Sequence, residues 1–381
     1  MKLALVLDQF DPAAGGLERW TIGFATHLAA SGHDVHIAAF AAAPDPQLPL
    51  HIPPASHGIL VRARSMAECV ARIGADAVLD TGTSWAGHVF MPCTGSRRLS
   101  QTRLVATHPP LLRLRAAISP KSRWRDRQMA RLEREQVRRA RQIIAVSALV
   151  RQLLLAQHPI APERITVIHN GVDVARFSPE RTAPFRAGLR ATLGVGEGTL
   201  FLGSAHNMRL KGMDSAIRAL ARLVGGGAEA HLAIAGADPG PDWTRLAASL
   251  GVAARVHFLG LVDDMVPLFG AADALVHPTR WDACSLSTIE AGAAGLPVIT
   301  TAQNGAAELL RDGETGYVLP DPEDVAALAD RMRRLLDPSL RRRLGEAART
   351  AAKAHDVSLN YERVEAVLKS TAHALSPSPA G

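Results

Sequence analysis

Short apolar runs recur along the chain and predict buried strands. They occupy residues 3–7, 35–39, 77–79, 143–147, 165–168, 199–204, 231–237, 256–262, 274–277 and 297–301. Continuous apolar runs of about four to eight residues are typical of parallel strands that are buried on both faces. Most of the runs are separated by segments with the apolar spacing of helices. This alternation predicts an α/β fold built from doubly wound parallel sheets.

The length and the turn signals predict two domains. A chain of 381 residues has room for roughly two or three domains of ordinary size. The run at 165–168 leads into Asn170-Gly171, a strong turn signal, and the stretch from 178 to 198 is rich in Pro, Arg and Gly. We therefore predict an N-terminal domain over residues 1–178 and a C-terminal domain over residues 179–356, with 178–198 as the linker region.

The composition excludes several other classes of protein. Hydrophobic residues make up 47% of the chain, which is enough for large cores. No apolar run approaches the roughly 18 residues of a membrane-spanning helix, and the run at 3–7 is followed at once by Asp8, which makes it too short for a secretory signal. The cysteines Cys69, Cys93 and Cys284 have neither disulfide-like nor metal-like spacing. These features predict a protein of the reducing cytoplasm.

The positive charge is concentrated in one segment. Residues 97–151 contain fifteen Lys or Arg and three Asp or Glu, a net charge of +12, so the remainder of the +7 chain carries −5. The core of this segment, Lys121–Arg141, has a narrow apolar side at near-helical spacing. That side consists of Trp124, Met129, Leu132, Ala140 and Ile144.

This basic segment has three interpretations. The first is a solvated helix face. The second is contact with an anionic membrane surface, worth about 1 kcal/mol for each basic residue near it. The third, a nucleic-acid partner, is disfavoured because aromatic residues are few and no base-reading module is present.

One stretch combines an acid with the start of a helix. Asp282 stands just before a small-residue helix that begins at about Ser285, and Glu290 follows eight residues after Asp282. The first backbone N–H groups of a helix have no internal partner, and the helix dipole favours negative charge there. The pattern therefore predicts an anion site at the helix start. The alternative is that Asp282 only favours the start of the helix.

A second candidate follows the strand at 199–204. Arg209 and Lys211 precede Gly212 and a helix over 215–224. Fixed cations at this place can stabilise negative charge that develops on a departing phosphate group more strongly in the transition state than in the ground state. A surface pair of cations is the alternative.

A third candidate is the glycine pair Gly15-Gly16, between the strand at 3–7 and a helix that ends near Gly32. Two glycines allow the backbone to approach a ligand closely. The pair does not form the Gly-x-Gly-x-x-Gly fingerprint, so it gives little support to a dinucleotide site. A plain tight turn is the alternative.

Taken in order, these motifs resemble those of the retaining nucleotide-sugar glycosyltransferases of family 4. The acid-x7-acid pair departs from the family pattern at Asp282, where the family has Glu. The family's interdomain crossover is matched by Asn170-Gly171-Val172-Asp173-x-x-x-Phe177-x-Pro179, and its closing strings by residues 303–310 and 312–318. The resemblance extends over nearly the whole chain.

The resemblance implies the GT-B fold, in which two doubly wound Rossmann-like domains face each other across a cleft. It also implies that a last helix, over residues 357–375, packs back on the N-terminal domain. A nucleotide-diphosphate sugar would lie in that cleft. No metal cofactor is expected, because Arg209 and Lys211 would supply the positive charge at the diphosphate.

The resemblance also implies roles for individual residues. Arg209 and Lys211 would bind the diphosphate, and Asp282 would face the transferred sugar. The family assigns Glu290 to the ribose hydroxyls. The remaining donor-binding positions are the amides near Ser285, Leu286 and Ser287 for the phosphates, backbone near Leu261 or Val262 for the base, commonly uracil, and Gly15 and Gly16 for the donor phosphates or the acceptor.

Many members of the family have a catalytically placed histidine in the N-terminal domain. The candidates for that position are His108 and, if the loop after Phe90 is the matching one, Cys93.

The expected function is transfer of a sugar from a nucleotide sugar, commonly a UDP-sugar, to a glycan or lipid-linked acceptor with retention. Lipopolysaccharide or surface-polysaccharide synthesis at the inner face of the membrane is the expected setting. One alternative is a nucleotide-sugar epimerase on the same fold. Another is a non-catalytic glycan- or lipid-binding protein, which the Asp at position 282 makes conceivable.

Overall fold

The computed structural model describes residues 1–12, 15–43, 47–107, 113–114, 118–236 and 238–375. The chain divides into two compact units. The first consists of Met1–His169 and Asn360–Gly381, and the second of Asn170–Leu359. The division therefore falls nine residues before the sequence-derived boundary at 178 and three residues after the one at 356. Each unit has its own sheet.

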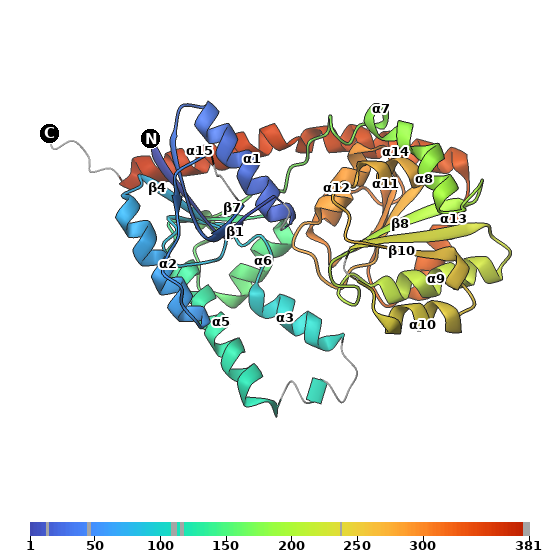
Figure 1. Cartoon of the computed structure of the whole chain (residues 1–381), viewed down its shortest axis with the longest axis horizontal. Helices are drawn as coiled ribbons and strands as arrows, with labels where there is room; N and C mark the ends of the chain where they lie inside the picture. Colours follow the sequence, from blue (N-terminus) through green and yellow to red (C-terminus); the bar gives the residue numbers. More distant parts are fainter. Residues whose placement is uncertain (13–14, 44–46, 108–112, 115–117, 237, 376–381) are drawn as a thin grey trace. The chain divides into compact units, whose positions relative to one another are not determined.

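The sheet of the first unit has parallel strands in the order β3-β2-β1-β4-β5-β6-β7 (Figure 1). Leu5 lies at its centre, fully buried, in register with Ile37 on one side and Leu79 on the other. The strand order reverses between β1 and β4, which places a potential ligand site beyond the carboxyl ends of these two strands. The strands are β1 Lys2–Phe10, β2 Asp34–Ala42, β3 Leu50–His51, β4 Ala77–Asp80, β5 Val89–Phe90, β6 Gln142–Ala145 and β7 Ile165–Val167.

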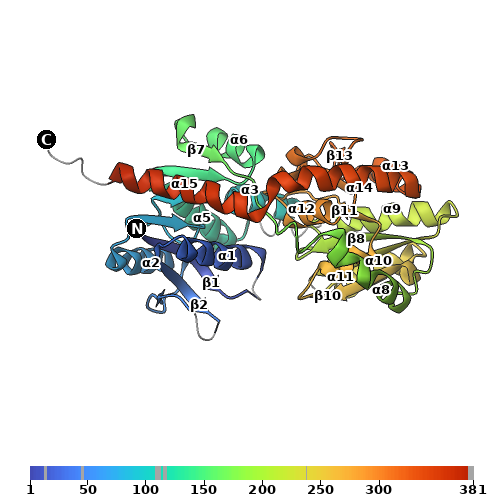
Figure 2. The same cartoon turned by 90° about the horizontal axis from the view of Figure 1, so that it is seen from above.

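Helices cover this sheet. They are α1 Gly16–Ala30, α2 Ile59–Ile73, α3 Arg97–Ala106, α5 Pro120–Arg139, α6 Ala148–Gln157 and α15 Val357–Leu375. Figure 2 shows α15 beside α1, although the two are more than 300 residues apart in sequence. Trp20 Nε1 donates to Asn360 Oδ1 at 2.7 Å, and Glu365 accepts from His27 at 2.8 Å. These contacts attach the C-terminal part of α15 to the first unit.

The sheet of the second unit has parallel strands in the order β10-β9-β8-β11-β12-β13. The strand order reverses between β8 and β11. Doubly wound sheets bind ligands beyond the carboxyl ends of the strands at such a reversal, so we expect a ligand site there. The strands are β8 Thr199–Ala205, β9 Ala230–Gly236, β10 Val256–Gly260, β11 Ala274–His277, β12 Val298–Thr301 and β13 Gly316–Leu319. The predicted α/β class is therefore confirmed for both units.

Helices also cover both faces of the second sheet. They are α7 Pro179–Thr182, α8 Arg186–Thr192, α9 Met213–Gly225, α10 Pro241–Ser249, α11 Val266–Ala271, α12 Leu286–Ala293, α13 Val325–Arg334 and α14 Pro338–Ala352. One core cluster joins α9 and α13 to the sheet through side chains such as Phe201, Ile217 and Met332, which are fully buried. Helix α14 packs so closely on the turn after α12 that a Cβ at Gly345 would lie 2.0 Å from the carbonyl oxygen of Gly295.

The predicted linker at 178–198 is wrong. The segment forms α7 and α8, which pack on α11, and a Cβ at Gly270 would lie 2.0 Å from the carbonyl oxygen of Thr182. Pro179 and Pro184 stand at helix starts, where a missing N–H is tolerated. Arg190 is 9% exposed and binds Asp273 at 2.9 Å. Composition misled the prediction because these prolines and arginines begin helices and form ion pairs.

Helix α5 carries the basic segment, and its apolar side is narrower than the sequence suggested. Leu132 is buried on the helix, and Trp124 is 53% exposed. Trp124 therefore does not belong to the packed side of the helix. Ala140 is only the C-cap of α5 and Ile144 lies in β6, so the predicted apolar side does not extend to these two residues. Among the residues that the structure describes, no helix combines the length and the apolar character that crossing a bilayer requires.

Candidate active site

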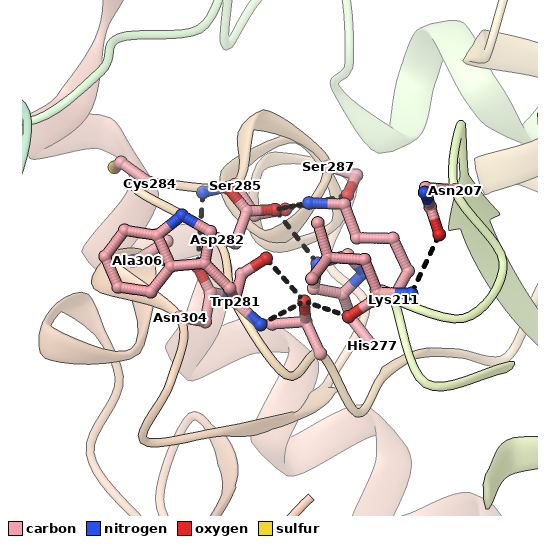
Figure 3. Close-up of polar contacts among 12 residues, drawn as sticks. Asn207, Lys211, His277, Trp281, Asp282, Cys284, Ser285, Ser287, Asn304 and Ala306 are labelled. Carbon is pink, nitrogen blue, oxygen red and sulfur yellow. Dashed lines mark hydrogen bonds and ion pairs between the residues drawn. The ribbon is translucent and has the colours of Figure 1, made fainter. Parts of the chain in front are cut away.

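The loops after β8 and β11 meet beyond the carboxyl edge of the second sheet. Lys211 Nζ donates to Asp282 Oδ2 at 2.5 Å, and His277 Nε2 donates to the same oxygen at 3.2 Å (Figure 3). The structure thus places Lys211 and Asp282 together at the switch point of the sheet. Asp282 Oδ1 has no hydrogen-bond partner among the described residues.

The carboxyl group of Asp282 is ionised. Burial opposes its ionisation, but the charge of Lys211 and then the hydrogen bond from His277 hold the pKa of Asp282 well below its usual range. The Asp282 side chain is 16% exposed and that of Lys211 is 20% exposed, so the pair is only partly screened by water. Asp282 is therefore an acceptor and a negative charge, and it has no proton to donate.

His277 is the last residue of β11 and is 1% exposed. Burial lowers its pKa, which the hydrogen bond to Asp282 partly offsets, so the imidazole is neutral near pH 7. A carboxylate can only accept, so the proton is on Nε2, while Nδ1 has no partner among the described residues. The sequence interpretation missed His277. Its position before Pro278, at the end of an apolar run, was the available signal.

Gly212 brings the loop after β8 close to the loop after β11. Its φ is +69°, and a Cβ there would lie 2.0 Å from the carbonyl oxygen of Pro278. The preceding turn is closed by Asn207, whose side-chain oxygen accepts from Leu210 N at 2.9 Å. A residue with a side chain would be strained by the positive φ and would collide with Pro278. These two constraints explain why glycine follows Lys211.

The start of α12 presents backbone amides without an intrahelical acceptor next to Asp282. Ser285 is the N-cap, and its Oγ accepts from Thr288 N at 3.3 Å and lies 2.9 Å from Ser287 Oγ. That cap satisfies only one of the first N–H groups of the helix. The amides of Leu286 and Ser287 have no intrahelical acceptor. The family resemblance also named the amide near Ser285, but Ser285 N donates to Asn304 Oδ1 at 3.2 Å.

Asn304 fixes the loop that carries Asp282. Its Oδ1 accepts from Ser285 N at 3.2 Å, and its Nδ2 donates to Thr288 Oγ1 at 3.0 Å. The backbone N–H of Asp282 donates to Gln303 O at 3.0 Å. Figure 3 shows Asn304 behind the loop. Sequence reasoning quoted Asn304 only as part of a closing string, because its contacts span 16 to 19 residues.

Arg280, in the loop after β11, is hydrogen-bonded to the turn after β8 and to two carboxylates. It donates to Asp214 at 2.8 Å and to Glu323 at 2.5 Å, and its Nη1 donates to Arg209 O at 2.5 Å. These carboxylates raise the pKa of Arg280 although burial opposes its charge. The backbone of the Arg209–Lys211 turn is therefore held by an ion-pair network, which no sequence signal revealed.

The side chain of Arg209 does not reach Asp282. It lies 3.6 Å from Asp242, above the ring of Trp243 at 5.6 Å, and is 40% exposed. Glu290 is half-buried on α12, and Leu261 lies just past β10 with 74% of its side chain exposed. The structure thus joins Lys211 directly to Asp282 and leaves Arg209 on the α10 side of the turn.

The described candidates of the first unit lie at the carboxyl edge of its own sheet. Gly15 and Gly16 form the N-cap and first residue of α1. Burial, followed by the charge of Glu18, raises the pKa of Cys93 to about 12, so the thiol is protonated. Its Sγ donates to Met91 O at 3.4 Å. His108 lies outside the described residues.

Asp80 ends β4 and builds the turn that follows it. One carboxylate oxygen accepts from Gly82 N and Thr83 N at 2.7 Å, and the other accepts from Ser84 Oγ at 2.6 Å. These bonds account for the carboxylate as a turn-forming group. In the described part of the chain, no group of three or more His, Cys, Asp or Glu is arranged to hold a metal ion.

Two family models match the chain. The model described as Glycosyltransferase Family 4 matches residues 14–176, and the model described as Glycosyl transferases group 1 matches residues 197–338. The loops that form the site around Asp282 fall within the second match.

Curated relatives match over different lengths. The lipopolysaccharide glucosyltransferase WaaG of Escherichia coli (strain K12) is 34% identical over 199 residues, which are 51% of this chain and 53% of WaaG. The chain thus spans about half the length of this relative. A glycogen synthase of Mycobacterium tuberculosis (strain ATCC 25618 / H37Rv) is 29% identical over 388 residues, which are 92% of this chain and 89% of that protein.

Solved structures match over nearly the full chain. A crystal structure of WaaG, described as a glycosyltransferase involved in lipopolysaccharide biosynthesis, has a TM-score of 0.79 and 26% identity, and covers 96% of this chain and 99% of its own. Anabaena HepE in complex with UDP and glucose has a TM-score of 0.72 at 20% identity, and covers 97% of this chain and 100% of its own. At that identity HepE shows the fold alone.

Proposed function

The chain belongs to the glycosyltransferases of group 1 and family 4 and has their GT-B fold, and from this premise we propose that it transfers a hexose from a nucleotide-diphosphate sugar to a glycan or lipid-linked acceptor. The observation that carries the proposal is the group at the end of β11. Lys211, Asp282 and the start of α12 bring a cation, an anion and unpaired amides to one edge of a sheet.

This arrangement suits the breaking of a bond between a sugar and a diphosphate. When the bond between the anomeric carbon and the phosphate oxygen lengthens, negative charge grows on the diphosphate and positive charge grows on the sugar ring. Lys211 and the amides of Leu286 and Ser287 are suited to the first charge, and Asp282 to the second. Because Lys211 is paired with Asp282 at 2.5 Å, donor binding exchanges this ion pair for one with phosphate.

The other donor-binding roles follow from the family. Glu290 binds the ribose hydroxyls, and backbone near Leu261 reads the base, for which we propose uracil. Arg209 joins the diphosphate by leaving Asp242, an exposed partner at 3.6 Å. Gly15 and Gly16 approach the donor or acceptor.

We propose that transfer occurs with retention and without a metal cofactor. A diphosphate leaves without being protonated, so the reaction needs no general acid there. Asp282 cannot supply a proton, because its pKa is held low by Lys211 and His277. We assign Asp282 to charge stabilisation rather than to nucleophilic attack. Nuclear magnetic resonance of the product's anomeric centre tests retention, and turnover in excess EDTA tests the absence of a metal cofactor.

The match to WaaG suggests a lipid-linked acceptor of lipopolysaccharide or another surface glycan. Helix α5 supports a position at an anionic membrane surface. Its first turns expose Lys121, Arg123, Arg125 and Arg127 around the exposed Trp124. A ring with a polar edge surrounded by cations suits the headgroup layer of a bilayer.

Vesicle binding tests this membrane contact. The full chain is expected to sediment with vesicles that contain phosphatidylglycerol at low salt, and less so at higher salt. The variant with Arg123, Arg125 and Arg127 changed to Gln is expected to lose about 3 kcal/mol of binding free energy. Equal binding to neutral vesicles, or no effect of the substitutions, would contradict the contact.

Donor screening tests the catalytic proposal. Each nucleotide sugar is added to the full chain and the melting temperature is measured, because a ligand at about one hundred times its Kd adds about 2.7 kcal/mol of stability. Stabilising donors are then incubated with and without acceptor glycans. A stabilising donor that is hydrolysed slowly supports transfer, whereas epimerised sugar without acceptor, or binding without any turnover, would replace the proposal with an epimerase or a binding protein.

A further inference from the structure

The second unit has a pocket at the edge of its sheet opposite the candidate active site. Its volume is about 740 Å³. It lies beside Asp273, which immediately precedes β11, and beside the segment that leads into β8 at Thr199. Because parallel strands start at one edge and end at the other, this pocket is separated from Asp282 by the length of β11. The residues that line it include Arg186, Arg190, Glu197, Asp273, Arg341 and Pro338, the first residue of α14.

One of the three arginines has a structural role. Arg190 donates to Asp273 Oδ2 at 2.9 Å, to Ala271 O at 3.1 Å and to Gly196 O at 2.9 Å. Arg190 as a whole is 9% exposed. All three nitrogens of its guanidinium donate hydrogen bonds within the second unit. Arg190 therefore fixes the floor of the pocket and has no capacity for a ligand.

The other two arginines keep donors that no hydrogen bond within the described residues uses. Arg186 uses Nη2 for Asp273 at 2.6 Å and Nη1 for carbonyl groups at the end of α11, and its side chain is 44% exposed. Arg341 uses Nη1 for Leu335 O at 2.7 Å, for Leu336 O at 3.0 Å and for Thr199 Oγ1 at 3.3 Å. These bonds leave Nε of Arg186 and Nε and Nη2 of Arg341 without a hydrogen-bond partner among the described residues.

Positive charge exceeds negative charge at this pocket. Among the lining residues, three guanidinium groups stand against Asp273, which is buried, and Glu197, which is exposed at the rim. Burial lowers the pKa of Arg341, Asp273 and Asp337 offset this in part, and Arg186 and Arg190 lower it further. The cations therefore repel one another, and an additional anion between them would relieve the repulsion.

We propose that this pocket binds a small phosphate monoester, with its phosphate group between Arg186 and Arg341. Planar guanidinium groups match phosphate oxygens with paired hydrogen bonds, and a phosphate dianion offsets two of them. A phosphate group fills only part of 740 Å³, so the remainder of the pocket takes the organic part of the ligand. The proposal is independent of sugar transfer, because no residue of the pocket belongs to the site around Asp282.

Isothermal titration of the full chain with β-glycerophosphate tests the proposal, at constant ionic strength set with chloride. The Lys211→Ala background weakens anion binding at the candidate active site. In that background, Arg186→Gln and Arg341→Gln are each expected to raise the Kd at least tenfold. Glu197→Gln, which removes an exposed negative charge from the rim without touching a hydrogen bond, is expected to lower the Kd.

Arg218 supplies the matched control, because it is exposed on α9 and does not line the pocket. Arg218→Gln removes the same charge and is expected to leave the Kd unchanged. The proposal is overturned if no heat of binding is detected, if Arg218→Gln weakens binding as much as Arg341→Gln, or if Glu197→Gln does not tighten it. Binding of inorganic phosphate as strong as that of β-glycerophosphate would overturn the monoester assignment. Failure of donor turnover would leave all of these results unaffected.

Discussion

Lys211 Nζ and Asp282 Oδ2 lie 2.5 Å apart, although the two residues are separated by 71 positions in the chain. The ion pair joins the loop after β8 to the loop after β11, at the point where the strand order of the second sheet reverses. It gives the candidate active site a charge pair that a phosphate ligand must open. The first two predictions concern its two members.

Replacing Lys211 by Ala is expected to reduce kcat/KM by a factor of about 10² to 10³, or about 2.7–4 kcal/mol of transition-state stabilisation. The reason is that the leaving diphosphate loses a fixed cation. Steady-state kinetics with the donor found by screening measures the effect. Arg218→Ala is the matched control, since it removes an exposed cation of the same unit. Undiminished kcat/KM in Lys211→Ala would refute the phosphate role.

Replacing Asp282 by Asn is expected to separate binding from turnover. The amide keeps the shape of the side chain but removes the charge that faces the sugar, so kcat should fall. Lys211 is then released from its ion pair, so the Kd for the nucleotide diphosphate should stay equal or become lower. Calorimetry and single-turnover kinetics measure the two quantities. A weaker nucleotide complex with unchanged kcat would show that Asp282 acts in binding and not in the reaction.

Replacing Gly212 by Ala is expected to displace Lys211. The backbone φ of +69° costs a non-glycine residue about 1–2 kcal/mol, and a Cβ there meets the carbonyl oxygen of Pro278 at 2.0 Å. Gly313→Ala is the matched control, because its φ is +77° and its Cβ would meet nothing within 4 Å. Urea unfolding should show a larger loss for Gly212→Ala, and only this variant should lose activity. Equal losses in both variants would exclude the contact with Pro278 as the cause.

The stability of the second unit is expected to fall as the pH is lowered from about 6.5 to about 4. Burial, followed by the charges of Arg255 and His257, lowers the pKa of His231 from 6.5 to about 4. In that range the unfolded chain binds the proton and the folded chain does not, so protonation favours unfolding. Above pH 6.5 the contribution of His231 to stability is fully present.

Urea unfolding at pH 7 and pH 5 checks this dependence. His231→Gln should show a smaller decrease in stability between the two pH values than the parent chain. His57→Gln, at an exposed histidine of the first unit, should decrease as much as the parent. An identical decrease in His231→Gln and the parent would assign the pH dependence to other groups.

Much of the fold could be predicted because the strands are short, apolar and buried on both faces. Leu3 to Leu7 and Ala274 to His277 are recognisable for this reason. The strand β13 was not predicted, because Gly316 and Tyr317 stand in a turn-rich string that gives no apolar run. The segment 178–198 was misassigned, because its arginines are paired with Asp273, a partner about 80 residues away.

The candidate site was only partly predictable for a similar reason. The acid and the helix start at 282–290 are a local pattern, and so is Arg209-x-Lys211-Gly212. His277 and Asn304 belong to the same cluster through contacts that only the folded sheet creates. Arg209 shows the reverse case, because its motif suggested a paired role with Lys211 while its side chain contacts Asp242 and Trp243.

The contacts described around Asp282 all join residues between Asn207 and Glu323. The second unit alone thus positions the anion-binding groups. Their distances from one another depend on the pairing of β8 with β11, because the loops that carry Lys211 and Asp282 follow these two strands. Two residue pairs, Phe201 with Ala274 and Leu202 with Leu275, define that register. We expect substitutions that shorten these side chains to reduce turnover at temperatures where the chain remains folded.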